Sequence, residues 1–482
     1  MLSLKKNFFY NIILAVSQVL FPLISFPYAS RILTPVGIGQ VSFVDSFTQY
    51  FIVIAALGIP FYGIREIAKA TYDKAILRQT FSELLVIHFL STAVTFLCFL
   101  MMIFLIDDLR STLMLSILGV IYLFLSIFTM EWFFQGLEQF RMIAIRTVAI
   151  RLITLILLFF FVRTPEDISK YYALTVISVA LTGAINMYYS RRFTSLTFRN
   201  LNLKKHLKPL FVILSIGIIA KVYSLIDSVL LGVFSSPENV GYYAAASRVI
   251  SVVLVCVNAF GVVLIPRMSA LFSAGDSAEI DLLLEKSLNF SLFISIPVAC
   301  ILFFLSDEII SLFAGNMFQN SIIVLQILAI MVVFTGVAQV AVQQVLIPSG
   351  KEKYVFYASL AGAVVSVSLN LILIPRLKEL GTALSFLTTE IIVTCICFRF
   401  ANIISRLKLS GKLLITSFIS CVPIYIIKTC CINVFDNNNQ LLVLLLSFFV
   451  GGSIYLTAQL FVWRNEAAVL IYNNILKKYR HV

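Results

Sequence analysis

The stretch KVYSLIDSVLLGVFSSPENVGYYAAASR, from Lys221 to Arg248, places charged side chains inside sequence that is otherwise apolar enough for a membrane. A charge at the bilayer centre costs about 2.5–3.5 kcal/mol on insertion scales, so such residues usually face protein or a water-filled cavity. Pro237 and Gly241 mark a turn between two helices. At about 1.5 Å per residue, Asp227 and Arg248 lie roughly 12 and 10 Å from this turn. The stretch therefore predicts a helical hairpin with opposite charges at similar depth, as one wall of a polar cavity in a transporter.

The composition is that of a membrane protein. Of 482 residues, 60% are hydrophobic and 12% are charged, whereas a soluble domain carries about 25% charged residues. The apolar runs reach the length of about 20 residues that a membrane-spanning helix needs, and none shows the ten-residue alternation of a barrel strand. Hydropathy predicts an all-α protein of about fourteen spans. They cover residues 8–33, 40–62, 80–106, 112–134, 142–162, 171–190, 210–233, 242–266, 287–305, 321–347, 354–374, 380–402, 413–432 and 441–463.

A repeated motif indicates two related halves. Thr34-Pro35-x-x-Ile38-Gly39 returns as Ser236-Pro237-x-x-Val240-Gly241, and Ala56-Leu57-Gly58-Ile59 returns at nearly the same offset as Ala259-Phe260-Gly261-Val262. An even number of spans per repeat predicts a pseudo-two-fold axis along the membrane normal, as in other transporters. The expected domains are an N-lobe with the basic linker (1–205), a C-lobe (206–402), and two further helices with a basic tail (403–482).

The net charge of +13 follows the membrane topology. With the N-terminus inside, about 25 Lys and Arg residues fall on inner loops and about 7 on outer loops, as the positive-inside rule requires. We therefore expect both termini to be cytoplasmic and no nucleic-acid partner. The longest inner loop, Arg191 to Lys208, is expected to set topology, to touch anionic headgroups and to join the halves.

Motifs for enzymatic chemistry are missing from the sequence. Ser410-Gly411-Lys412 lacks the glycine spacing and the Ser/Thr of a nucleotide-binding loop, and no catalytic Ser-His-Asp set or carboxylate pair can be assembled. The three histidines and eight cysteines lack the spacing of metal ligands. We expect no enzyme activity, no cofactor and no metal site.

Charged residues within the predicted spans are the candidate site. Arg151 and Lys221 lie too deep to reach the headgroups, which favours a cavity, whereas Arg146 could either snorkel or face a cavity. Asp227 and Arg248 could form a structural pair or a gate. Glu390 could be a coupling carboxylate, the partner of a basic residue or a solitary lumen carboxylate. The cationic set, predicted to bind the substrate, comprises Arg146, Arg151, Lys221 and Arg248.

Because the embedded charges are mainly positive, the cavity suits an anion such as phosphate or pyrophosphate, which Arg and Lys bind well. A pump that exports cations would instead need carboxylates in its lobes. Further polar residues within the spans could line the same space, although each alone more often forms a hydrogen bond between packed helices. They are Gln18, Asp45, Asn186, Asn258, Gln339 and Asn370.

Several segments together resemble one family. FPYASRILTPVGIGQVSF, LGIPFYGIREIAKA, EWFFQGLEQFRMIAIR and YSLIDSVLLG followed by VGYYAAASRV are similar to Wzx-type polysaccharide flippases of the MOP superfamily, which also holds MATE multidrug pumps and lipid II flippases. The run Trp132-x-x-Gln135-Gly136-x-Glu138 is the most specific piece. The resemblance extends to about residue 400.

The resemblance implies two six-helix lobes, alternating access and a cationic lumen. It further implies that an undecaprenyl-pyrophosphate-linked O-antigen or capsule repeat unit crosses a bacterial inner membrane. Membrane lipids, a polysaccharide polymerase and a chain-length regulator would be its other partners. Two alternatives stay open at this stage: a MATE-like ion-coupled efflux antiporter, and a membrane scaffold for glycan assembly that does not itself transport.

Overall fold

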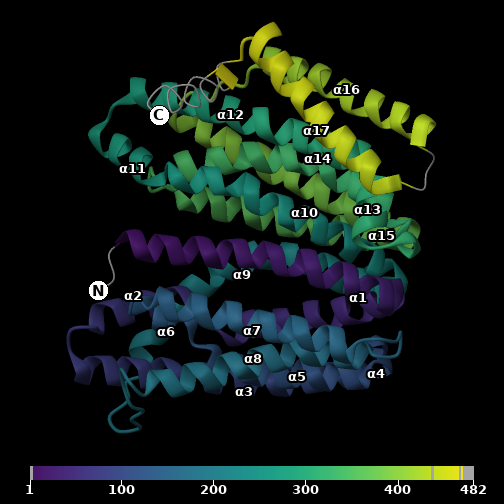
Figure 1. Cartoon of the computed structure of the whole chain (residues 1–482). Coiled ribbons are helices and arrows are strands. Elements are labelled where there is room, and N and C mark those ends of the chain that lie inside the picture. The colour runs from purple at the N-terminus through teal and green to yellow at the C-terminus, as the bar shows by residue number, and fades with distance from the viewer. Residues whose placement is uncertain (1–3, 436–438, 466–467, 470–482) are drawn as a thin grey trace. The chain divides into compact units, whose positions relative to one another are not determined.

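The computed structural model describes residues 4–435, 439–465 and 468–469, without the side chains of residues 4–8, 215–225, 256, 258–263 and 435. The described chain is built from helices (Figure 1), which confirms the all-α class. Ten of these helical stretches are long and apolar enough to cross a membrane. The ten agree closely with the predicted spans, and the count of fourteen stays a prediction.

The chain divides into two compact units, with the boundary along the sequence between Gly241 and Tyr242. The first unit therefore includes the helix 204–234, which the predicted boundary at residue 205 had assigned to the C-lobe. Its elements are α1 (Leu4–Ala55), α2 (Ile59–Ala70), α3 (Lys74–Leu105), α4 (Asp107–Ser111), α5 (Leu113–Ser126), the 3-10 turn η1 (Ile127–Thr129), α6 (Glu131–Gly136), α7 (Phe140–Phe161), α8 (Ile168–Ser190), α9 (Lys204–Phe234) and the start of α10 (Pro237–Val263).

The second unit continues from α10. Its further elements are α11 (Ile265–Ala274), α12 (Ser277–Phe304), α13 (Ser306–Phe313), η2 (Asn316–Phe318), α14 (Ser321–Gln339), the π-helical η3 (Val340–Leu346), α15 (Glu352–Ile404), α16 (Gly411–Phe435), α17 (Gln440–Thr457) and the π-helical η5 (Ala458–Val462). Within this unit α14 packs between α12 and α15, and α16 packs against α12 and α17.

The two longest helices each contain two predicted spans. Thr34 interrupts α1 with φ 64° and ψ 170°, directly before Pro35. A proline cannot donate the helical hydrogen bond and restricts the residue before it, so the chain bends there. Lys378 interrupts α15 with φ 51°, three residues after Pro375. These breaks separate spans 1 and 2, and spans 11 and 12, where the sequence predicts them.

One predicted boundary is wrong. The span 40–62 ends at Ala55, because Leu57 and Gly58 adopt left-handed conformations with φ 48° and 78°. A separate amphipathic helix, α2, then begins at Ile59. Residues 63–79, between the predicted spans 40–62 and 80–106, are therefore largely helical. Gly58 therefore has no local counterpart in Gly261, which lies inside α10.

The most specific motif of the sequence packs α6 against α2. Trp132 lies on Gly63, where an added Cβ would come within 2.6 Å of the indole. Gly136 lies on Ile67 in the same way, at 2.8 Å. The ring of Trp132 also contacts Phe81 on α3. Part of this motif therefore serves packing in the aromatic core of the first unit.

The loop from Arg191 to Lys208 is anchored to α3. Glu83 is fully buried and accepts hydrogen bonds from the backbone N–H of Asn202 (2.8 Å) and from Lys205 Nζ (2.7 Å). His206 Nε2 lies 2.9 Å from the same carboxylate, and its Nδ1 lies 2.8 Å from Tyr62 Oη. These contacts hold the loop to the first unit. The loop is therefore anchored to the protein, in addition to the expected roles of joining the halves and touching the headgroups.

Candidate functional site

A polar cavity of about 510 Å³ lies inside the first unit. Side chains from α1, α2, α3, α5, α6, α7 and α8 surround it, so it is enclosed by one bundle. Its polar lining residues are His88, Tyr122, Ser126, Thr129, Glu131, Gln135, Arg146, Thr147, Arg151, Ser178 and Thr182. Two of the four residues of the predicted cationic set, Arg146 and Arg151, therefore face one cavity.

Arg146 is held in place by several partners. Its Nη2 donates to Glu131 Oε1 at 2.7 Å and to Thr147 Oγ1 at 3.2 Å. Its Nη1 donates to Asn186 Oδ1, and the Asn186 amide donates to the carbonyl of Thr129. The Arg146 side chain is only 3% exposed. Snorkelling is therefore the wrong interpretation, and Asn186 makes the inter-helix hydrogen bond that the sequence allowed.

The Glu131–Arg146 pair was missed at the sequence level. Glu131 lies six residues before, and Arg146 seven residues after, the turn between α6 and α7, which comprises residues 137–139. The hairpin argument that was applied to Asp227 and Arg248 would have placed them opposite each other. Their spacing within EWFFQGLEQFRMIAIR was the available signal.

Arg151 keeps most of its guanidinium available. Its Nη1 donates to Ser17 Oγ at 2.6 Å, and its guanidinium lies 5.8 Å from the ring centroid of Phe21. No carboxylate of the described chain forms an ion pair with it. Since a guanidinium carries five N–H donors, several donors are free for a ligand. Arg151 is half-buried and also lines a second cavity, of about 200 Å³, with Ser25, Tyr171 and Thr175.

His88 also lines the cavity, and its imidazole has no hydrogen-bond partner among the described residues. The residue is 6% exposed. Buried polar groups are normally satisfied, but both ring nitrogens are closed off from the cavity in this structure, so a ligand or water would reach them only after a local rearrangement. At the sequence level His88 was weighed only as a metal ligand. A lone histidine in an otherwise apolar span was the signal that it lies in the protein interior.

The arrangement can bind an anionic, hydroxyl-rich group. Arg151 supplies positive charge and a planar fork of donors, which suits phosphate oxygens. Glu131 and Gln135 supply donors and acceptors for hydroxyl groups, and His88 would add to them if its ring nitrogens became accessible. In the described part of the chain, no group of three or more His, Cys, Asp or Glu residues could hold a metal ion.

The remaining residues of the predicted hairpin lie on two units. Asp227, on α9, is fully buried in the first unit and interacts electrostatically with Tyr50 of α1. Arg248, on α10, belongs to the second unit and is exposed. Lys221 lies on α9, and its side chain is outside the described residues. The pairing or gating role of Asp227 and Arg248, and the cavity role of Lys221, stay predictions.

Glu390 lies buried in the second unit at 7% exposure. Thr335 Oγ1, on α14, donates to its Oε1 at 3.0 Å. Among the described residues, no Lys, Arg or His forms an ion pair with this carboxylate. Three roles were considered for Glu390, and that of a partner for a basic residue has no support among the described residues. The coupling role and the solitary carboxylate stay open.

The fold and the polar cavity define a multi-pass membrane protein of the transporter class. The profile of the family described as "Polysaccharide biosynthesis protein" matches residues 4–272, more than half of the chain, and a MatE profile matches residues 213–372. The chain belongs to the polysaccharide biosynthesis protein family. The resemblance to the flippases of the MOP superfamily is thereby confirmed.

Two relatives carry the name "Putative O-antigen transporter". The one from Shigella dysenteriae is 25% identical over 81% of this chain and 98% of its own length. The one from Escherichia coli K12 is 24% identical over 83% and 97%. Both are named as transporters, in agreement with the expectation that the chain is no enzyme.

Solved structures share the fold. An inward-facing multidrug resistance MATE family transporter of the MOP superfamily superposes with a TM-score of 0.67 at 14% identity, over 80% of this chain and 94% of that one. The lipid II flippase MurJ in an inward closed conformation gives a TM-score of 0.62 at 15% identity, over 95% and 100%. At these identities the likeness establishes the fold alone.

Proposed function

We propose that this protein is a flippase for a lipid-linked glycan, an undecaprenyl-pyrophosphate-linked O-antigen or capsule repeat unit. The observation that carries the proposal is Arg151, whose guanidinium faces a polar intramembrane cavity with most of its donors free. Membership of the family and the relatives named as O-antigen transporters support it.

The cavity offers a division of roles. Arg151 would bind a phosphate of the substrate, while Arg146, whose charge is balanced by Glu131 and which also bonds Asn186, would hold the cavity wall in place beside it. His88 would hydrogen-bond a hydroxyl or phosphate oxygen once its ring nitrogens become accessible. Lys221 and Arg248 complete the proposed cationic set. The polyprenyl tail stays in lipid, because an apolar chain gains nothing from a polar cavity.

The distribution of basic residues among the loops supports an orientation in the membrane. We infer a bacterial inner membrane, cytoplasmic termini and transport from the inner to the outer leaflet by alternating access. The positive-inside distribution of Lys and Arg supports this orientation. A polysaccharide polymerase and a chain-length regulator would act on the product after it reaches the outer face.

An Arg151 variant series tests the proposal in cells that depend on this protein for surface glycan. Arg151→Ala should abolish glycan display and cause the lipid-linked precursor to accumulate, at normal protein abundance. Arg151→Lys should retain only part of the glycan display, because the ammonium of lysine is a point charge and lacks the bidentate fork of the guanidinium. Arg141→Ala is the matched control. It removes the same charge from an exposed position on α7 that does not line the cavity.

A companion variant separates ligand binding from charge. His88→Leu keeps the volume and removes the orphaned ring nitrogens, so it should leave abundance unchanged and reduce export. Normal export by both Arg151→Ala and His88→Leu would exclude this cavity as the substrate site.

The efflux antiporter is the second candidate, because the MatE profile matches part of the chain and Glu390 is a buried carboxylate. It predicts that Glu390→Gln raises sensitivity to cationic drugs while surface glycan is unaffected. The cationic residues in the cavity of the first unit favour the flippase.

A further inference from the structure

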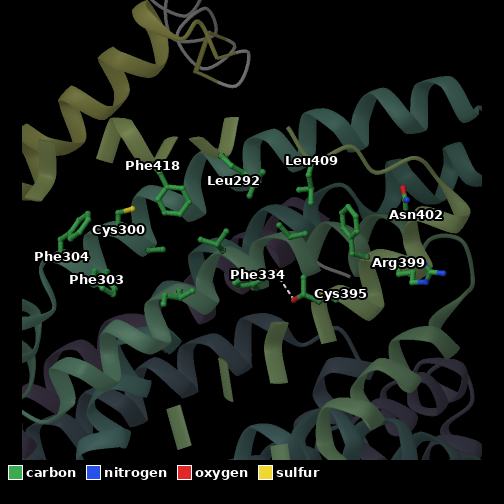
Figure 2. Close-up of a pocket in the computed structure, with 17 residues that line it drawn as sticks. Leu292, Cys300, Phe303, Phe304, Phe334, Cys395, Arg399, Asn402, Leu409 and Phe418 are labelled. Atoms are coloured by element: carbon green, nitrogen blue, oxygen red, sulfur yellow. Dashed lines mark hydrogen bonds between the residues drawn. The ribbon is translucent and has the colours of Figure 1, made fainter. Parts of the chain in front are cut away.

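An apolar groove of about 870 Å³ opens among α12, α14, α15 and α16 in the second unit (Figure 2). Leu292, Phe303, Phe334 and Phe418 are among the side chains that form its wall. All four helices belong to stretches apolar enough to span the membrane. The groove is thus walled by helices of membrane-spanning character, and water is not a suitable occupant for so apolar a space.

One end of the groove is polar. Arg399 and Asn402 lie together at this end, opposite Phe303 and Phe304 (Figure 2). Arg399 is exposed, and none of the ion pairs or hydrogen bonds of the described chain involves its guanidinium. Its charge is therefore available at the mouth of an apolar groove.

Hydrogen bonds and packing fix the connection that forms the mouth of the groove. The connection between α15 and α16 follows Ile404, and Asn402 Oδ1 accepts the backbone N–H of Leu407 at 2.9 Å. Leu407 is 6% exposed and packs into the core of this unit. Asp281 Oδ1 on α12 accepts the backbone N–H of Arg406 at 3.2 Å. These anchors hold Leu409 against the groove, where it lines the wall.

The connection that forms this mouth is rich in basic residues. Arg406, Lys408 and Lys412 are exposed on the same connection and at the start of α16, within thirteen positions of Arg399 in sequence. Asp281 is the one carboxylate seen to contact this connection in the described residues, and there it binds a backbone N–H. The local charge is therefore strongly positive at the polar end of the groove.

We propose that this groove is a binding site for an anionic phospholipid, with an acyl chain along the apolar wall and the phosphate on Arg399. Clusters of Lys and Arg beside membrane helices attract anionic headgroups, and a guanidinium binds phosphate oxygens in bidentate fashion. A zwitterionic lipid would fill the wall equally well but would gain less at the mouth. This site is separate in its residues from the cavity around Arg151, so it does not depend on the proposed function.

Lipid retention tests the proposal. The full chain is purified in detergent, incubated with phosphatidylglycerol or phosphatidylcholine, and analysed by native mass spectrometry. The wild type should retain phosphatidylglycerol preferentially. Arg399→Gln should reduce this preference about fivefold, the factor that corresponds to one basic side chain at a membrane surface. Lys353→Gln, which removes an exposed charge of the same unit outside the groove, should not change it.

A second variant tests the wall. Cys395 is exposed and lines the groove, so Cys395→Trp should fill part of it and lower the retention of both lipids. Equal retention of both lipids by the wild type, or an unchanged preference in Arg399→Gln, would overturn the proposal. Displacement of phosphatidylglycerol by polyprenyl phosphate at equal concentration would also overturn it, because the groove would then belong to the transported lipid.

Discussion

Gly39 lies directly against the carbonyl oxygen of Pro237, so that a Cβ at position 39 would be only 1.6 Å from it. The contact has a reciprocal partner, since a Cβ at Gly241 would lie 2.0 Å from the carbonyl oxygen of Pro35. Each copy of the repeated motif therefore places its glycine on the proline carbonyl of the other copy. Reciprocal contacts of this kind are produced by a local two-fold relationship.

Gly39→Ala and Gly241→Ala should each destabilise the protein, because the atom in the way is backbone and cannot rotate aside. Forcing a methyl group into a close-packed contact typically costs about 1–3 kcal/mol. We expect lower melting temperatures and reduced export. Gly452→Ala is the control, since nothing lies within 4 Å of its added Cβ. A wild-type melting temperature for both motif variants would contradict this contact.

The repeated Pro and Gly residues could be found in the sequence, and they do mark helix breaks and close contacts. What the sequence could not reveal is that the two copies touch each other, since a repeat carries no information about the distance between its copies. For Gly58, the sequence instead suggested a correspondence that the structure does not have. Similar letters at the same offset suggested equivalence with Gly261, but only Gly58 has a left-handed backbone at a helix junction.

The candidate site, too, was predicted from the sequence only in part. The apolar context of Arg151 was enough to predict that it lies at a cavity, because an embedded charge has few alternatives. The role of Arg146 depended on Glu131, whose spacing across the turn between α6 and α7 was a usable signal, and on Asn186 of α8, which no local spacing predicts. The sequence therefore identified the charges and missed their partners.

Arg146 should behave as a structural residue, in contrast to Arg151. Arg146→Ala removes the partner of Glu131 and of the buried Asn186 amide. Leaving a buried polar group unsatisfied costs about 1–3 kcal/mol, so we expect lower abundance and a lower melting temperature. The double variant Arg146→Met/Glu131→Gln removes both charges and should recover part of the loss. If Arg146→Ala is as abundant as the wild type, the network does not stabilise the fold.

Asp167 should make the stability of the first unit depend on pH. Its carboxylate binds Lys170 Nζ at 2.6 Å and accepts the backbone N–H groups of Arg163 and Thr164 at 2.9 Å. The Lys170 contact, then these backbone contacts, hold the pKa of Asp167 well below its usual range. A lowered pKa stabilises the fold above the ordinary value of about 3.9, and this stabilisation is lost as the pH falls towards the lowered pKa.

Asp167→Asn therefore should lower the melting temperature at pH 7, and the difference from the wild type should shrink as the pH falls below about 3.9. Thermal unfolding in detergent at pH 7 and pH 3 measures it. Lys170→Met, which removes only the partner, should give a smaller effect of the same sign. A difference that stays constant between the two pH values would show that the carboxylate charge is not what stabilises this turn.

Glu390 should link proton binding to transport in the second unit. An ionised carboxylate in this buried position has the Thr335 hydroxyl as a donor and no basic partner among the described residues, so its charge and its exposure to water should change together. Glu390→Gln keeps an acceptor for Thr335 and removes the titration. We expect normal abundance, with export that no longer responds to an imposed pH gradient across the membrane of proteoliposomes. Thr335→Val is the control, because it removes the hydrogen bond and leaves the titrating group. If Glu390→Gln responds to the gradient as the wild type does, Glu390 is a solitary packing carboxylate, and the driving ion must bind elsewhere.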